Sequence, residues 1–268
     1  MIIVEPFDFN IVFPFSLPLT GPAPRLSVNN GAPLANLLSA DPRELYVSGA
    51  GYPAQFYIDL GVDTAWDTIS LINTNGVSTA IWSASCGTDA QAGYFASEPL
   101  PLSALRVPSE DVASINGPAL FWSSAPIVSR YIYFYVTQPA GSAPISIGRL
   151  VIGKSWRPTW PREPGAGRPS IDTGGRERLP DGGLATVAGS LVSGFRWTFG
   201  DLTDADLAKL WGIWRRRRTT EPVLIVEDPA APVAEGIHYG TFTALDAYER
   251  SIVSKSRWSL SMEDWTGG

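Results

Sequence analysis

Cysteine and histidine are almost absent from this sequence. The 268 residues include one cysteine, Cys86, and one histidine, His238. A single cysteine excludes a disulfide within the chain, and one residue of each kind excludes a zinc site built from cysteine and histidine ligands of one chain. No stretch approaches the ~18 apolar residues that a membrane-spanning helix needs. We therefore predict a protein without a cofactor, a metal ion or membrane insertion.

The N-terminus begins with apolar residues, but it lacks the basic region that opens a secretion signal. Glu5 and Asp8 lie within this stretch, and prolines interrupt it. Secretion signals place an uninterrupted apolar segment after a positively charged start. We expect residues 1–24 to form a first strand and an extended arm instead.

Charged residues are also scarce, at 17% of the chain, below the usual ~25%. Residues 1–153 contain 5 arginines, no lysine and 11 acidic residues, whereas residues 154–268 contain 15 basic and 15 acidic residues. The whole net charge of −6 therefore lies in the first half. Neither half has the basic composition of a nucleic-acid-binding domain, so we expect no nucleic-acid partner.

What the sequence does contain is typical of a β protein with many turns. Glycine (26 residues) and proline (23 residues) are frequent, and 44% of the residues are hydrophobic. Strand patterns recur at residues 55–60, 68–72, 78–84, 119–123, 130–137 and 145–152. Short strands at this spacing, without a helical pattern between them, predict an antiparallel β-sandwich of the jelly-roll type over residues 25–153.

The second half is predicted to contain a β-rich assembly domain, residues 191–268, with one short helix. Residues 154–190 are rich in Pro, Gly and Arg and have little periodicity, which indicates a linker or an inter-subunit arm. A helix is predicted over residues 203–217, with a capping box formed by Thr203 and Asp206. The predicted buried face of this helix consists of Leu207, Leu210, Trp211 and Trp214.

The first half resembles a discoidin-type, galactose-binding-like jelly roll. The residues that carry the resemblance are Phe56 to Gly61 (FYIDLG) and Trp66 to Asn75 (WDTISLINTN). The segments 131–137 and 147–153 resemble the last two strands of that fold. These are core and turn positions, so the resemblance implies a fold more directly than a ligand.

The second half resembles the C-terminal region of tail-tip or baseplate proteins of long-tailed bacteriophages. It has their order of a rim strand (147–153), a Leu- and Trp-rich helix (207–214), a PVLIVEDP strand (222–229), a Tyr-Gly strand (239–240) and a closing WSLSMED strand (258–264). The resemblance implies a structural subunit of the virion, made in the host cytoplasm. It would bind other tail proteins and copies of itself in a ring, and contribute to host attachment.

No arrangement in the sequence indicates catalysis. His238 lacks the nucleophile and the orienting partner that a general base needs, and we expect it in a loop before the strand at 239–245. Cys86 is expected to be a small buried or loop residue. We therefore predict that the protein is not an enzyme and has no catalytic residue. A glycan hydrolase is the weakest alternative.

Two sets of residues are candidates for binding. Aromatic residues and arginine are enriched in interfaces, and the interface candidates are Trp156, Trp160, Arg215 and Arg216. Aromatic residues can also stack on sugars, and the glycan-contact candidates are Trp66, Trp82, Tyr94 and Trp122, with core packing as the alternative for each. Asp63 and Asp67 are weighed as Ca²⁺ ligands. The main hypothesis is a tail-tip subunit, and the alternative is a carbohydrate-binding module that recognises a surface glycan.

Overall fold

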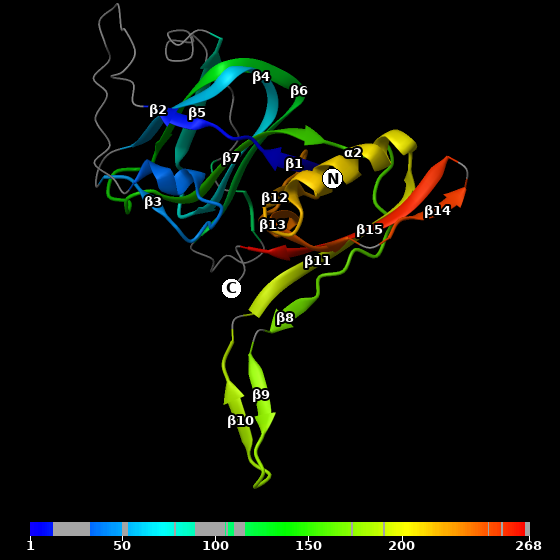
Figure 1. The fold of residues 1–268 in the computed structure, drawn as a ribbon. Helices are drawn as coiled ribbons and strands as arrows, with labels where there is room; N and C mark the ends of the chain where they lie inside the picture. Colours follow the sequence, from blue (N-terminus) through cyan, green and yellow to red (C-terminus); the bar gives the residue numbers. More distant parts are fainter. Residues whose placement is uncertain are drawn as a thin grey trace, which may run out of the picture. The chain divides into compact units, whose positions relative to one another are not determined.

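The protein is mainly β, as predicted (Figure 1). The computed structural model describes residues 1–12, 33–49, 53–77, 79–88, 105, 107–109, 116–172, 174–189, 191–245, 247–252 and 254–265. The chain forms two compact units. The sandwich unit contains Ile2–Trp156 and Leu224–Ile237, and the hairpin unit contains Met1, Arg157–Val223 and His238–Gly268.

The sandwich unit is built from antiparallel strands in the order β5-β6-β4-β7-β1-β12, with β2 beside β4 and β3 beside β7. The strands are β1 (Ile2–Pro6), β2 (Asn10–Val12), β3 (Tyr46–Val47), β4 (Ala54–Thr74), β5 (Ile81–Gly87), β6 (Gly117–Thr137), β7 (Ser146–Trp156) and β12 (Val223–Val226). Two 3₁₀ helices, η2 (Leu34–Leu38) and η3 (Ala234–Gly236), complete the unit. Residues 224–237 pack here, although the sequence analysis assigns them to the C-terminal domain.

β4 and β6 are each one long strand where the sequence predicts two. They pair along their length, with irregularities in register between Asp59 and Thr64. Gly61, with φ of +82°, lies in this irregular stretch, and residues 61–63 are exposed. An irregularity of this kind bends a strand without ending it. Both halves of β4 therefore reach the same core, through Phe56 on one side of the bend and Trp66 on the other.

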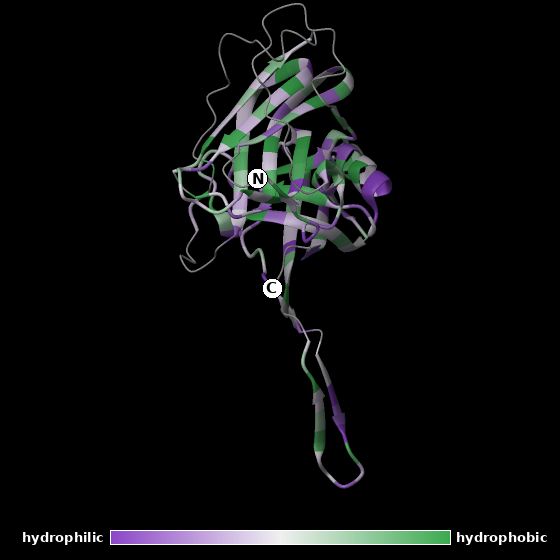
Figure 2. Ribbon diagram, turned by 90° about the vertical axis from the view of Figure 1, so that its left-hand side faces the viewer, coloured by the Kyte–Doolittle hydropathy of each residue, from purple (hydrophilic) through white to green (hydrophobic). Residues whose placement is uncertain are grey.

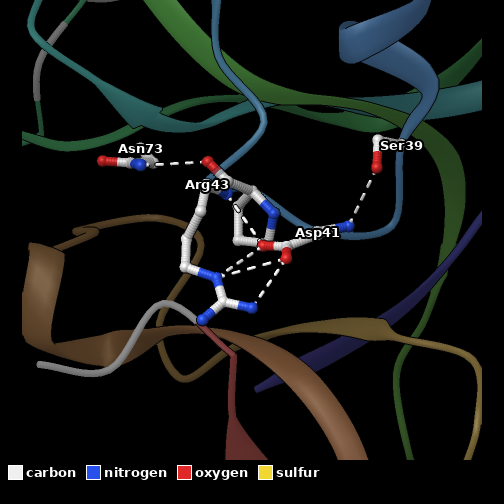
Figure 3. Close-up of polar contacts among 5 residues, drawn as sticks. Ser39, Asp41, Arg43 and Asn73 are labelled. Atoms are coloured by element: carbon white, nitrogen blue, oxygen red, sulfur yellow. Dashed lines mark hydrogen bonds and ion pairs between the residues drawn. The ribbon is translucent and has the colours of Figure 1, made fainter.

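Two asparagines of the jelly-roll resemblance hold loops against the end of β4. Asn73 donates a hydrogen bond from Nδ2 to the carbonyl oxygen of Pro42, at 3.0 Å (Figure 3). Asn75 donates to the carbonyl oxygen of Pro144, at 2.9 Å. The Pro42 carbonyl also lies so close to Gly148 of β7 that any side chain there would overlap it. These residues therefore position loops, which is a structural role.

The hairpin unit contains a second antiparallel arrangement, in the order β13-β15-β11-β8, with β14 beside β15. Its strands are β8 (Ser170–Asp172), β11 (Leu191–Leu202), β13 (Ile237–Leu245), β14 (Glu249–Ile252) and β15 (Lys255–Asp264). Two further strands, β9 (Gly175–Arg178) and β10 (Leu184–Val187), pair only with each other. The buried side chains of this sheet include Phe195, Trp197, Phe199, Phe242, Trp258, Leu260 and Met262.

The helix α2 (Asp204–Arg217) begins with the predicted capping box. The Oγ1 atom of Thr203 accepts a hydrogen bond from the backbone N–H of Asp206, at 3.1 Å. The Asp206 carboxylate accepts one from the Thr203 hydroxyl, at 2.8 Å. Acidic residues lie in the first turn and Arg215 to Arg217 in the last, which suits the helix dipole at both ends.

The predicted buried face of α2 is correct for Leu210 but wrong for Trp211. The buried residues are Asp206, Leu210 and Ile213, whereas Trp211 is 41% exposed. At ~100° per residue, the observed face is rotated by roughly 80° from the predicted one. The prediction omitted Asp206 because it is polar, but its carboxylate is satisfied by the cap and can be buried. Trp214 lies at the flank of the helix, half-buried.

Candidate functional site: an exposed hairpin and a basic helix

The β9–β10 hairpin lies within the segment that the sequence analysis interprets as a linker or arm. Its register runs from Gly175 opposite Val187 to Arg178 opposite Leu184. Gly182, with φ of +86°, closes the turn and donates its N–H to the carbonyl oxygen of Leu179, at 2.9 Å. The strands were missed because they are short and lack alternation. The Pro-Asp-Gly sequence at 180–182 is the turn signal that could have revealed them.

The β9–β10 hairpin projects away from β8 and β11 (Figures 1 and 2). Every residue of β9 and β10 is exposed except Ala185, which is half-buried. Three exposed apolar side chains lie on it: Leu179 (42% exposed), Leu184 (59%) and Val187 (73%). An isolated two-stranded hairpin is marginally stable in water, and unpaired strand edges favour pairing with another chain. The hairpin therefore has the properties of an interaction element.

The base of the hairpin is fixed to the sheet of its own unit. Glu163 donates its N–H to the carbonyl oxygen of Thr198, at 2.8 Å. Gly167 exchanges two backbone hydrogen bonds with Arg196, at 2.9 and 3.1 Å. β8 then continues this pairing along β11. The first part of the segment 154–190 is thus a sheet edge, and the part that projects is limited to β9, β10 and their turn.

The four interface candidates lie in different places. Trp156 is half-buried at the end of β7, where it is the partner of Ile3 in β1. Trp160 is 52% exposed, with the Lys255 ammonium 5.5 Å from the centre of its ring. Arg215 and Arg216 are exposed on the last turn of α2. The structure therefore keeps three of the four side chains accessible.

Two of the glycan-contact candidates belong to the core. Trp66 has no exposed surface, and its Nε1 donates a hydrogen bond to Ser129 Oγ at 2.8 Å. Trp82 is 5% exposed and packs edge-on against Phe134. Neither ring is available for stacking on a sugar, so both tryptophans are corrected to core residues. Large aromatic side chains serve either role, which is why sequence alone did not separate the two.

Only one of the other two glycan-contact candidates lies among the described residues. Tyr94 lies outside the described residues. Trp122 is half-buried, and its Nε1 is 3.4 Å from Ser155 Oγ. The same serine donates its hydroxyl and its backbone N–H to the two carboxylate oxygens of Asp67, at 2.9 and 2.7 Å. These bonds occupy the oxygens that a Ca²⁺ ion would use.

The remaining titratable candidates occupy structural positions. His238 is in β13 rather than in a loop, is 1% exposed, and has its ring centre 3.6 Å from that of Phe195. Burial raises the pKa of the Cys86 thiol, which disfavours the reactive thiolate. Among the described residues, no group of three or more His, Cys, Asp or Glu side chains could hold a metal ion. No described helix is long and apolar enough to cross a membrane.

Comparison with known proteins finds distant structural similarity. No family model matches the chain, and no curated protein matches it. A solved structure titled CpGH89CBM32-6, from Clostridium perfringens, is 16% identical, with 55% of this chain and 92% of that chain covered at a TM-score of 0.33. CBM32-1 from a family 31 glycoside hydrolase of the same organism is 13% identical, with 56% and 96% covered at 0.34.

A third solved structure is a histidine mutant of the lectin binding domain of Lectinolysin complexed with Lewis b. It is 12% identical, with 46% of this chain and 83% of that chain covered at a TM-score of 0.31. At such low identities and TM-scores, these similarities assign no family, ligand or activity to this chain. None of the three structures is described as a phage component, so the tail-tip interpretation rests on the sequence resemblance.

Proposed function

We propose that this protein is a structural subunit of a bacteriophage tail tip or baseplate, and that the β9–β10 hairpin is its assembly arm. The observation that carries the assembly role is the hairpin, which projects from its unit with exposed apolar side chains and unpaired edges. The phage setting is supported by the sequence resemblance of the second half. Its elements correspond to β7, α2, β12, β13 and β15.

The energetics of the hairpin favour a partner. Leu184 and Val187 bury only a minor part of their apolar surface in the hairpin's own fold, because they remain 59% and 73% exposed. Covering apolar surface stabilises a complex by about 25 cal/mol per Å². A partner that covers these side chains would also add a strand to an open edge of the hairpin. Assembly therefore supplies the stabilisation that the isolated hairpin lacks.

The decisive test removes the hairpin alone. Residues 175–187 are replaced by Gly-Gly. The new link joins residues 174 and 188, which lie next to the paired residues Gly175 and Val187. A longer deletion that began at 162 would also remove the bonds of Glu163 and Gly167 to β11. We expect the shortened chain to fold but to be absent from purified particles. A full-length Leu184→Ser/Val187→Ser variant should incorporate poorly. Normal incorporation of the shortened chain would contradict the assembly role.

A second candidate is a carbohydrate-binding module in the sandwich unit. It is favoured by the face of β6 opposite to the core, where Tyr131, Tyr133 and Tyr135 alternate with the buried Ile132 and Phe134. Half-buried aromatic rings beside polar groups suit stacking on sugar rings. Retention of the protein on a glycan array, lost in Tyr135→Ala but kept after hairpin deletion, would support this function. No retention on any glycan would reject it.

A further inference from the structure

Four aromatic side chains of the hairpin unit form a continuous row, which begins with two tryptophans of α2 and continues beside the helix. The ring centres of Trp214 and Trp211 are 5.5 Å apart, Trp211 and Trp258 are 5.8 Å apart, and Trp258 and Tyr248 are 6.0 Å apart. We call these four residues the aromatic row. Trp258 is buried, whereas Trp211 is 41% and Tyr248 47% exposed. The row is thus anchored in the core and open to solvent on both sides of Trp258.

The row is bordered by positive charge. Arg215 and Arg218 are exposed at the C-terminal end of α2, and Arg218 donates its backbone N–H to the carbonyl oxygen of Trp214. Arg215 follows Trp211 by four residues, which places the two side chains on the same side of the helix. Another arginine, Arg217, is paired with Glu221 at 2.8 Å. Trp, Tyr and Arg are the residue types that most often dominate binding energy at interfaces.

The sandwich unit has the opposite charge. Residues 2–156 and 224–237, which make up this unit, contain 14 acidic residues, 5 arginines and 1 lysine. Asp8, Glu44 and Asp63 are exposed, whereas two of the five arginines, Arg43 and Arg130, are already paired with carboxylates. A second copy of this chain therefore offers an acidic surface that complements the basic end of α2.

We propose that the aromatic row and the basic end of α2 dock on the acidic sandwich unit of a second copy. This inference rests on the proposed assembly function and names a second surface for it, with its partner. The two surfaces differ, so the contact is head to tail, and repeating it closes a ring or extends a filament. The net charge of −6 disfavours a nucleic acid as the occupant.

The α2 contact is distinguishable from the hairpin contact by its salt dependence. Exposed charges are screened beyond about 10 Å at 0.1 M salt, so the α2 contact should weaken as salt is raised. The described hairpin strands and turn contain two arginines, Arg176 and Arg178, and two acidic residues, Glu177 and Asp181. Because these charges balance, association through the hairpin should depend little on salt.

The test uses two complementary charge reversals in the full chain. Arg215→Glu/Arg218→Glu reverses the basic end of the helix, and Glu44→Lys/Asp63→Lys reverses exposed acidic positions of the sandwich unit. None of these four side chains makes a hydrogen bond or salt bridge with another described residue, so both variants should fold. In sedimentation velocity at low salt, we expect each variant alone to self-associate at least about tenfold more weakly than the unchanged chain. An Arg176→Glu/Arg178→Glu variant, with the same change in net charge, should not show this salt-dependent loss.

Mixing the two reversed variants provides the sharpest readout. The mixture should recover association, because the intact helix end meets the intact sandwich unit and the reversed helix end meets the reversed sandwich unit. Trp211→Ala should weaken association without removing its salt dependence. Reversed variants that associate like the unchanged chain, while hairpin deletion abolishes assembly, would overturn this inference and leave the proposed function standing. The opposite pattern would overturn the hairpin's role alone. Binding of a single-stranded oligonucleotide that is lost on helix reversal, with self-association unaffected, would also overturn the inference.

Discussion

Two antiparallel strand pairs of this chain, β4–β6 and β9–β10, differ in the length of their strands and in the burial of their side chains. β4 and β6 span 21 residues each, and their inward side chains belong to the hydrophobic core of the sandwich unit. β9 and β10 span 4 residues each and bury no side chain. Backbone pairing therefore sets register in both pairs, but burial stabilises only one of them. The apolar residues of the short pair are free to serve a partner.

The largest difference should appear when one apolar side chain is removed from each pair. Trp66→Ala takes a fully buried ring from β4 and should lower the free energy of unfolding by about 3–5 kcal/mol. Leu184→Ala, on the exposed β10, should change it by less than about 0.5 kcal/mol. Urea unfolding measures both values. A comparable loss in the two variants would mean that the hairpin packs against its own chain.

The next effect concerns the two sides of α2. Leu210 is fully buried and Trp211 is 41% exposed. Leu210→Ala should lower the free energy of unfolding by about 2–5 kcal/mol, and Trp211→Ala by less, although tryptophan is the larger residue. Urea unfolding of the two variants measures both losses in free energy of unfolding. The reverse ranking would restore the helix face that the sequence pattern predicts.

Removal of the helix cap should have a smaller effect. Thr203→Ala deletes the oxygen that accepts the Asp206 N–H, and loss of such a cap costs about 1 kcal/mol. Thr219→Ala, at an exposed position beyond the helix, is the matched control and should be nearly neutral. Equal melting temperatures for Thr203→Ala and the unchanged chain would argue against the capping box.

The smallest effect comes from the ion pair at the bend of β4. The hydrogen bond from Arg130, at 2.8 Å, lowers the pKa of Asp59 from its ordinary value of 3.8. A lowered pKa in the folded state stabilises the protein above that ordinary pKa, and this stabilisation is lost as pH falls through the lowered value. Arg130→Gln should therefore reduce stability slightly at neutral pH, with no difference left in strong acid.

The exposed pair in Figure 3 is the control for this pH experiment. Arg43 and Asp41 are 2.7 Å apart, but the Arg43 side chain is 75% exposed. Ion pairs at such positions contribute little. Arg43→Gln should change thermal stability less than Arg130→Gln at neutral pH. A larger effect of Arg43→Gln would show that the more exposed ion pair contributes more to thermal stability, contrary to this account.

Local signals predicted the parts of the fold that depend on local structure. The capping box at Thr203 and the strands around Leu150 and Leu224 follow from short sequence patterns. Continuity of β4 through Gly61 could not be predicted, because a glycine within a strand pattern indicates a turn as readily as a bulge. The burial of Ile213 rather than Trp211 depends on packing against β11 and β15, which periodicity alone does not specify.

The candidate site was harder to predict than the fold. Trp66 and Trp160 are the same residue type, and only tertiary structure separates the core ring from the exposed one. The contact between Trp211 and Trp258 joins residues distant in sequence, so no local motif marks the aromatic row. The hairpin had a local signal in its Pro-Asp-Gly turn, but its strands lack the alternation that marks a half-buried strand.

The central claim is that the β9–β10 hairpin serves assembly and contributes nothing to the stability of its own chain. It is tested most directly by measuring mass and melting temperature together for the chain in which Gly-Gly replaces residues 175–187. At a salt concentration that screens the proposed α2 contact, and at a protein concentration at which the full chain forms a multi-copy species, we expect the shortened chain to sediment as a monomer with an unchanged melting temperature. The same multi-copy species without the hairpin, or a marked fall in melting temperature, would contradict the account.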